Sequence, residues 1–139
     1  VLNQMPKESI KVFIVDRDPR DIFVLEKYVW KDCIIPSDVV EFCKWFKYTR
    51  AHRKTERVDN KSVCFIQFED MVYKYDETAQ KIVDWLGLEL KEQNKKKKYF
   101  NPERSIRNTL TWKKMKCDPM EIKYIEDELR EYLYNFPEN

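Results

Sequence analysis

Two short apolar runs rich in β-branched residues predict buried β-strands. The first covers residues 10–15 (IKVFIV) and stops at a charged turn, and the second covers residues 63–68 (VCFIQF) and stops at Glu69 and Asp70. Strands that are apolar on both faces are typical of parallel sheets, because helices cover both faces of such sheets. The helical pattern between the two runs supplies the crossover that parallel pairing requires. We therefore expect an α/β fold with a parallel sheet.

Apolar residues at helical spacing predict two helices between these strands. We expect Asp21 to cap the first, whose opening turns are apolar. Ser37, which follows Pro36, is expected to cap the second, and the pattern of this helix continues to about Arg57. The last turns of the second helix are basic.

Two more helices are predicted after the second strand. The third covers residues 76–86, and Gly87 follows it as a left-handed C-cap. The fourth starts after Asp118, an N-cap residue followed by proline at the first helical position, and runs to about residue 136. Residues 101–116, between these helices, are expected to be irregular.

The composition favours a single domain that is not complete. The chain has 139 residues and 42% of them are hydrophobic, which is enough for one core. It has one glycine, although the turns and phosphate loops of an α/β enzyme need several. Two strands also make a poor sheet. We therefore expect residues 1–139 to be part of a domain whose sheet is completed by a missing N-terminal half or by a second chain.

The charge balance and the cysteines exclude several classes of protein. Lys and Arg number 27 and Asp and Glu 25, so the net charge of +2 argues against a dedicated nucleic-acid binder. No apolar run approaches the roughly 20 residues of a membrane span. The four cysteines form no C-x-x-C pair and the chain has one histidine, so no metal site is expected. Scattered thiols of this kind indicate a reducing, cytoplasmic location.

Two segments carry residues suited to an anion. Arg17 follows the first strand beside a helix N-terminus, where a guanidinium and free N–H groups can hold an anion together. An ion pair between Arg17 and a neighbouring aspartate is an equally good interpretation. Ser105, Arg107 and Asn108 offer hydroxyl, guanidinium and amide donors suited to phosphate or sulfate oxygens, although an exposed loop would contain the same residues.

Four motifs, in this order, resemble the sulfotransferase family, whose members use 3′-phosphoadenosine-5′-phosphosulfate (PAPS) and have a P-loop-type α/β fold. The resemblance spans residues 10–135, and the last motif is most similar to bacterial enzymes that act on sugars or surface polysaccharides. The motifs are Arg17-Asp18-Pro19-Arg20-Asp21 after a strand, Phe68-Glu69-Asp70-Met71 at the end of a strand, Trp85-Leu86-Gly87 at the end of a helix, and S-x-x-N-x-x-x-W-K at residues 105–113.

The resemblance implies roles for five residues. Arg17 would bind the 3′-phosphate of the nucleotide, and Phe68 would lie near the adenine. Ser105, Arg107 and Asn108 would close over the 3′-phosphate. The implied activity is transfer of a sulfuryl group from PAPS to an acceptor hydroxyl, on a carbohydrate or surface glycan, with the nucleotide product 3′-phosphoadenosine-5′-phosphate (PAP).

The chain also departs from the family pattern. Leu25 stands where the family often has a serine on the 3′-phosphate, and Leu110 stands where it often has a glycine before the tryptophan. The glycine-rich phosphosulfate loop, expected before residue 10, is not found. His52 does not match the usual catalytic base, so no catalytic residue is assigned and the chain alone is expected to be inactive.

Two other functions fit parts of the sequence. The basic residues 50–57 and the run at residues 95–100 (KKKKYF) suit a noncatalytic module that binds nucleic acid. A kinase-like P-loop protein, in which Arg17 contacts an ordinary nucleotide phosphate, would have the same strand-and-turn arrangement.

Overall fold

The computed structural model describes residues 11–31, 34–53, 62–88 and 100–137, and its contacts divide the chain into two compact units. The strand unit comprises residues 1–16 and 54–102, and the helical unit comprises residues 17–53 and 103–139. Each unit is therefore formed by two separate segments of the chain. Each unit is described by itself, and the expectation of a single partial domain stays a prediction.

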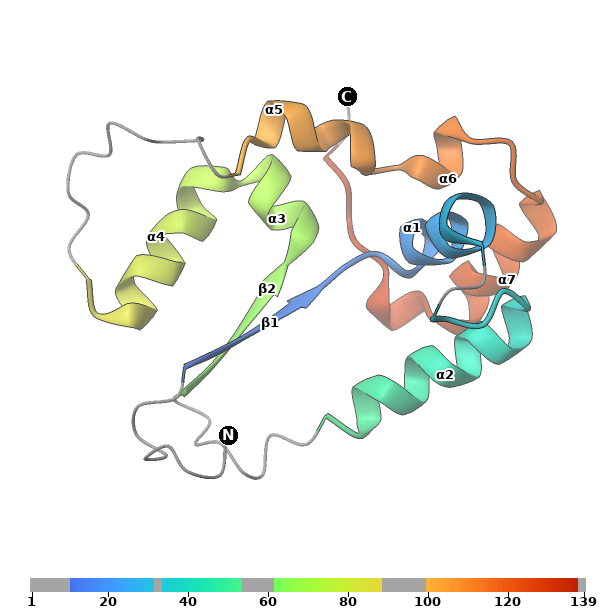
Figure 1. Cartoon of the computed structure of the whole chain (residues 1–139), viewed down its shortest axis with the longest axis horizontal. Coiled ribbons are helices and arrows are strands. Elements are labelled where there is room, and N and C mark those ends of the chain that lie inside the picture. The colour runs from blue at the N-terminus through green and yellow to red at the C-terminus, as the bar shows by residue number, and fades with distance from the viewer. Residues whose placement is uncertain (1–10, 32–33, 54–61, 89–99, 138–139) are drawn as a thin grey trace. The chain divides into compact units, whose positions relative to one another are not determined.

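The strand unit contains the predicted parallel pair. Strand β1 (Val12–Asp16) pairs with β2 (Val63–Gln67) in parallel, with Val12 opposite Val63 and Asp16 opposite Gln67 (Figure 1). Helix α3 (Phe68–Tyr73) begins directly after β2, where the sequence pattern predicted no helix. Helix α4 (Tyr75–Leu86) follows, and its C-cap Gly87 has a φ of +67°, as predicted.

This small sheet is only partly covered. Trp85 of α4 packs against Phe13 with ring centroids 4.9 Å apart. Phe13, Val15 and Phe65 nevertheless remain 42%, 56% and 48% exposed. Apolar side chains in parallel strands are ordinarily buried on both faces.

The helical unit is built from several helical elements (Figure 1), and most of them contribute side chains to one core. Eight buried side chains form that core: Phe23, Val24, Phe42, Cys43, Phe46, Ile122, Ile125 and Leu129. The elements are α1 (Pro19–Val24), the π-helix η3 (Leu25–Trp30), α2 (Val39–Ala51), α5 (Pro102–Ser105), the 3₁₀ turn η5 (Ile106–Asn108), α6 (Thr111–Lys114), α7 (Pro119–Glu128) and the 3₁₀ turn η6 (Arg130–Tyr132).

Two of the predicted N-caps are wrong. Helix α1 is capped by Asp18, not Asp21, because proline at the next position favours a helix start there. Helix α2 is capped by Asp38, not Ser37, since the Asp38 carboxylate accepts hydrogen bonds from the N–H groups of Val40 and Glu41. The predicted cap of α7, Asp118, is confirmed.

Two predicted helix ends and one segment predicted to be irregular also differ from the structure. Helix α2 ends at Ala51, and residues 54–57 of its predicted extension lie outside the described part of the chain. Helix α7 ends at Glu128 and is followed by η6, so it does not reach residue 136. Residues 101–116 are not irregular, since they contain three short helical turns. The described residues form a helix-rich α/β structure, and none of their helices is long and apolar enough to cross a membrane.

Candidate functional site

Arg17 and Asn108 are in contact within the helical unit. The Arg17 guanidinium donates a hydrogen bond through Nη2 to the backbone carbonyl of Asn108. The same nitrogen lies 3.7 Å from a carboxylate oxygen of Asp21, and the Arg17 side chain is 18% exposed. The ion pair that the sequence left open is therefore present, together with a contact to the loop of the fourth motif.

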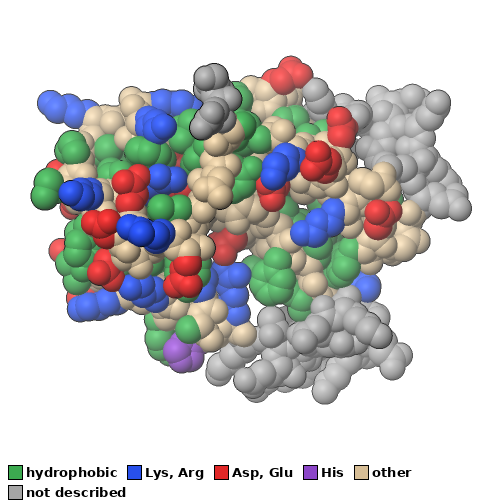
Figure 2. All heavy atoms as spheres, turned by 180° about the vertical axis from the view of Figure 1, so that it is seen from behind, with side chains coloured by type: hydrophobic (Ala, Val, Ile, Leu, Met, Phe, Trp, Pro, Cys, Tyr) green, Lys and Arg blue, Asp and Glu red, His purple; other side chains and the backbone are tan. Residues whose placement is uncertain are grey.

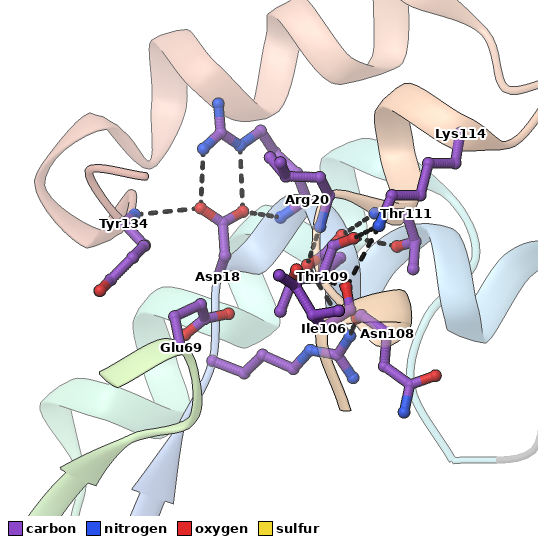
Figure 3. Close-up of polar contacts among 12 residues, drawn as sticks. Asp18, Arg20, Glu69, Ile106, Asn108, Thr109, Thr111, Lys114 and Tyr134 are labelled. Atoms are coloured by element: carbon purple, nitrogen blue, oxygen red, sulfur yellow. Dashed lines mark hydrogen bonds and ion pairs between the residues drawn. The ribbon is translucent and has the colours of Figure 1, made fainter. Parts of the chain in front are cut away.

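The loop that carries Ser105, Arg107 and Asn108 is held by its own polar contacts (Figure 3). The carbonyl of Ile106 accepts hydrogen bonds from the backbone N–H of Thr109, from its hydroxyl and from Lys114 Nζ, at 3.2, 2.8 and 3.2 Å. Lys114 Nζ also lies 2.5 Å from the carbonyl of Thr109. These bonds fix η5, from which the side chains of Arg107 and Asn108 are exposed while Ser105 is half-buried.

A buried carboxylate joins this loop to α1. Asp21 is fully buried, and its Oδ1 accepts hydrogen bonds of 2.6 Å from both the backbone N–H and the hydroxyl of Thr111. Its Oδ2 accepts a third, of 3.0 Å, from the N–H of Leu110. Burial raises the pKa of Asp21 above its ordinary value, although the bonds from Thr111 and the charge of Arg17 act in the opposite direction.

A second buried carboxylate occupies the N-terminus of α1 (Figure 3). Asp18 accepts hydrogen bonds from the N–H and Nε of Arg20 at 2.9 and 3.0 Å, from its Nη2 at 2.7 Å and from the N–H of Tyr134 at 3.0 Å. Arg20 also pairs with Glu126 at 2.8 Å and lies over the ring of Trp112. The Asp18 carboxylate thus takes up the N–H of Arg20, which the sequence suggested as a free donor for an anion.

Phe68 belongs to the strand unit, whereas the other four predicted site residues belong to the helical unit. It is the first residue of α3, and its ring meets that of Phe100 edge to face, with centroids 6.4 Å apart. Phe100 lines an apolar pocket of about 250 Å³ together with Met71, Tyr75 and Ile82. The role of Phe68 near an adenine stays a prediction.

The acidic pair after β2 has local partners. Glu69 is fully buried and accepts a 2.7 Å hydrogen bond from the Gln67 amide. Asp70 pairs with Lys74 at 3.4 Å. Both acidic side chains thus make local contacts at the end of β2 and the start of α3.

The basic segments behind the nucleic-acid alternative are only partly described. Arg50 lies with its guanidinium 3.4 Å from the ring centre of Phe46, so its side chain packs on the core. Residues 54–57 and 95–98 lie outside the described residues. On the face shown in Figure 2, positive and negative side chains are interspersed. Within the described residues, no group of three or more His, Cys, Asp or Glu side chains could hold a metal ion.

Sequence reasoning missed the residues that hold the loop in place, namely Asp21, Thr111 and Lys114. Asp21 was given only a capping role, and the other two received none. One signal was available for Asp21, because Asp18-Pro19 repeats the Asp118-Pro119 pattern and already supplies a cap. Asp21, three residues later, was therefore not needed as a cap and could have been expected to bind another group.

No family model matches this chain, and neither does any curated protein.

Proposed function

We propose that the helical unit carries the 3′-phosphate side of the nucleotide site of a PAPS-dependent sulfotransferase. The observation that supports this proposal most is the contact between Arg17 and Asn108, which are 91 residues apart in the chain. It joins two segments whose residue types had each suggested an anion site as one of two interpretations. A guanidinium beside a loop bearing a hydroxyl and a second guanidinium is a donor set suited to the oxygens of a phosphate monoester.

In the proposed reaction, the acceptor hydroxyl oxygen attacks the sulfur of PAPS. The bond from sulfur to the bridging phosphate oxygen breaks, PAP leaves, and the hydroxyl proton passes to a base outside the residues assigned to the site. A 3′-phosphate clamp contributes positioning to such an in-line transfer and selects PAPS over nucleotides that lack this group. The acceptor class, a sugar or surface glycan, is carried over from the resemblance alone.

The wider P-loop-type architecture is also part of the proposal. Its support is the exposure of Phe13, Val15 and Phe65 on the parallel pair, since further strands and helices would cover such residues. These additional elements would belong to a missing N-terminal half or to a second chain. The phosphosulfate loop would lie on them.

The first prediction concerns ligand preference. By titration calorimetry, PAP should bind more tightly than 5′-AMP or ADP, and Arg17→Ala should remove that preference, a loss of about tenfold or more for one charge-assisted contact to phosphate. Arg130→Ala is the matched control, because Arg130 is an exposed arginine of the same unit that pairs only loosely with Asp127, at 3.9 Å.

The alternatives give different results. A kinase-like protein would bind ADP at least as well as PAP. A nucleic-acid module would bind single-stranded oligonucleotides with steep salt dependence and would bind neither nucleotide well. If PAP is preferred and Arg17→Ala retains the preference, the site assignment is wrong.

A further inference from the structure

The Asp21 carboxylate is unusual because every polar partner described for it belongs to the proposed anion site. Three hydrogen bonds reach it from Leu110 and Thr111, at 3.0, 2.6 and 2.6 Å, and the Arg17 guanidinium lies 3.7 Å away. It thus touches both halves of the site, the arginine after β1 and the loop of the fourth motif.

Burying this carboxylate is unfavourable unless its contacts offset the lost hydration. Asp21 has 0% exposure, and burial raises its pKa. It does not serve as the cap of α1, since Asp18 does. An acidic residue in the first turn of α1 is favoured by the helix dipole. The helix does not explain why this carboxylate is buried, whereas its bonds to the loop and its contact with Arg17 do.

The loop needs such an anchor. Leu110 has a φ of +54°, in the left-handed region that residues other than glycine rarely adopt. In this conformation the consecutive N–H groups of Leu110 and Thr111 converge on one carboxylate. The hydrogen bonds to Asp21 therefore offset part of the strain at Leu110, two residues after Asn108.

We propose that Asp21 is the positioning residue of the anion site, holding Arg17 and the 105–111 loop at the spacing that a phosphate requires. This inference rests on the proposed function. Asp21 would act through Arg17 and the loop and would not touch the ligand.

A positioning role for Asp21 and a purely electrostatic role predict opposite effects of Asp21→Asn on phosphate binding. A negative charge 3.7 Å from the Arg17 guanidinium weakens the attraction of that group for an anion. If Asp21 were only a competing charge, Asp21→Asn would bind phosphate more tightly. If Asp21 positions the site, the same substitution weakens binding, because the amide replaces one acceptor oxygen with a donor.

The test compares PAP and 5′-AMP binding by calorimetry in wild type, Asp21→Asn, Thr111→Val and Thr111→Ser. Asp21→Asn should reduce the preference for PAP by about tenfold, with 5′-AMP binding little changed. Thr111→Val keeps the charge but loses the 2.6 Å hydroxyl bond, so it should reduce the preference less. Thr111→Ser keeps the hydroxyl and should behave like wild type.

A pH series tests whether the charge of Asp21 itself sets the preference. As the pH falls through the raised pKa of Asp21, the wild-type preference should approach that of Asp21→Asn. Titration of the phosphate itself affects both proteins equally and cancels in their ratio.

The outcomes distinguish the two proposals. A wild-type chain without any preference for PAP would overturn the proposed function and this inference with it. A wild-type preference that Asp21→Asn leaves unchanged or increases would overturn the inference alone. If Asp21→Asn does not fold, the Thr111 pair decides, and equal preferences in Thr111→Val and Thr111→Ser would overturn the inference.

Discussion

Leu110 has a backbone conformation that its side chain disfavours. Its φ of +54° and ψ of +33° place it in the left-handed region, which costs a residue with a Cβ about 1–2 kcal/mol. The resemblance had indicated glycine at this position. The structure gives a physical reason for that preference, because the turn that brings two N–H groups to Asp21 requires a positive φ.

Replacing Leu110 by glycine and by alanine should therefore reverse the usual order of stability. Both variants lose the same half-buried side chain, so their difference isolates the backbone. We expect Leu110→Gly to exceed Leu110→Ala by about 1 kcal/mol in the free energy of unfolding, measured by urea denaturation. At exposed Lys123 within α7, the same pair should give alanine the advantage by about 1 kcal/mol. The same order at both positions would contradict the assigned conformation.

At this scale the sequence identifies residues by their chemistry but not by their partners. Arg17 was predicted to be a candidate site residue because it follows an apolar strand. That position suits an anion ligand and an ion-pair member equally well. The contact with Asn108 could not be predicted without the family resemblance, since nothing local links residues 91 positions apart. Thr111 and Lys114 gave no signal, because threonine and lysine in a loop are ordinarily solvated.

At the scale of elements, the sequence correctly predicted the features that depend on neighbouring residues in the chain. The two strands, the Gly87 cap and the start of α7 all follow from short signals in the chain. Helix α3 was missed because its first residue, Phe68, continues the apolar run of β2. The π-helical turn η3 was also missed, since the spacing of apolar residues over a single turn does not distinguish π-helical from α-helical hydrogen bonding.

Helix α2 allows a chemical test of how the core is packed. Cys43 is 2% exposed within the aromatic core, and burial raises the pKa of its thiol to about 11. At pH 8 only about one thiol in a thousand would then be ionised, and the thiolate is the reactive form. Iodoacetamide should therefore modify the half-buried Cys117 well before Cys43 in the native protein, as read by peptide mass spectrometry.

Denaturant supplies the control for this experiment. In urea both cysteines lose their surroundings, so their modification rates should become similar. Native Cys43 reacting as fast as native Cys117 would show that α2 does not pack as described.

At the scale of the whole molecule, the chain contributes two separate segments to each unit. The sequence could not predict this alternation, because it depends on contacts between distant segments and not on any local pattern. In the helical unit, several of these contacts involve one buried ion pair. Asp18 and Arg20 join α1 to Glu126 of α7, to the ring of Trp112 and to the backbone of Tyr134.

Breaking this pair should destabilise both segments of the helical unit together. Asp18 is fully buried and the Arg20 side chain is 9% exposed, so Asp18→Asn leaves a largely buried cation without its closest partner. Leaving a buried charge wholly uncompensated costs about 3–5 kcal/mol, and the loss here should be smaller because Arg20 keeps Glu126 at 2.8 Å. Hydrogen exchange should accordingly accelerate in peptides from residues 17–53 and from residues 103–137.

Two further variants test whether the loss of the closest partner of Arg20 causes this destabilisation. Asp18→Asn combined with Arg20→Met removes the cation as well, and it should recover part of the lost stability because a buried ion pair can be replaced by apolar contacts. Glu41→Gln breaks the exposed pair with Lys44 and should change the unfolding free energy by less than about 1 kcal/mol. A single Asp18→Asn substitution as mild as Glu41→Gln would mean that the buried pair does not hold the two segments together.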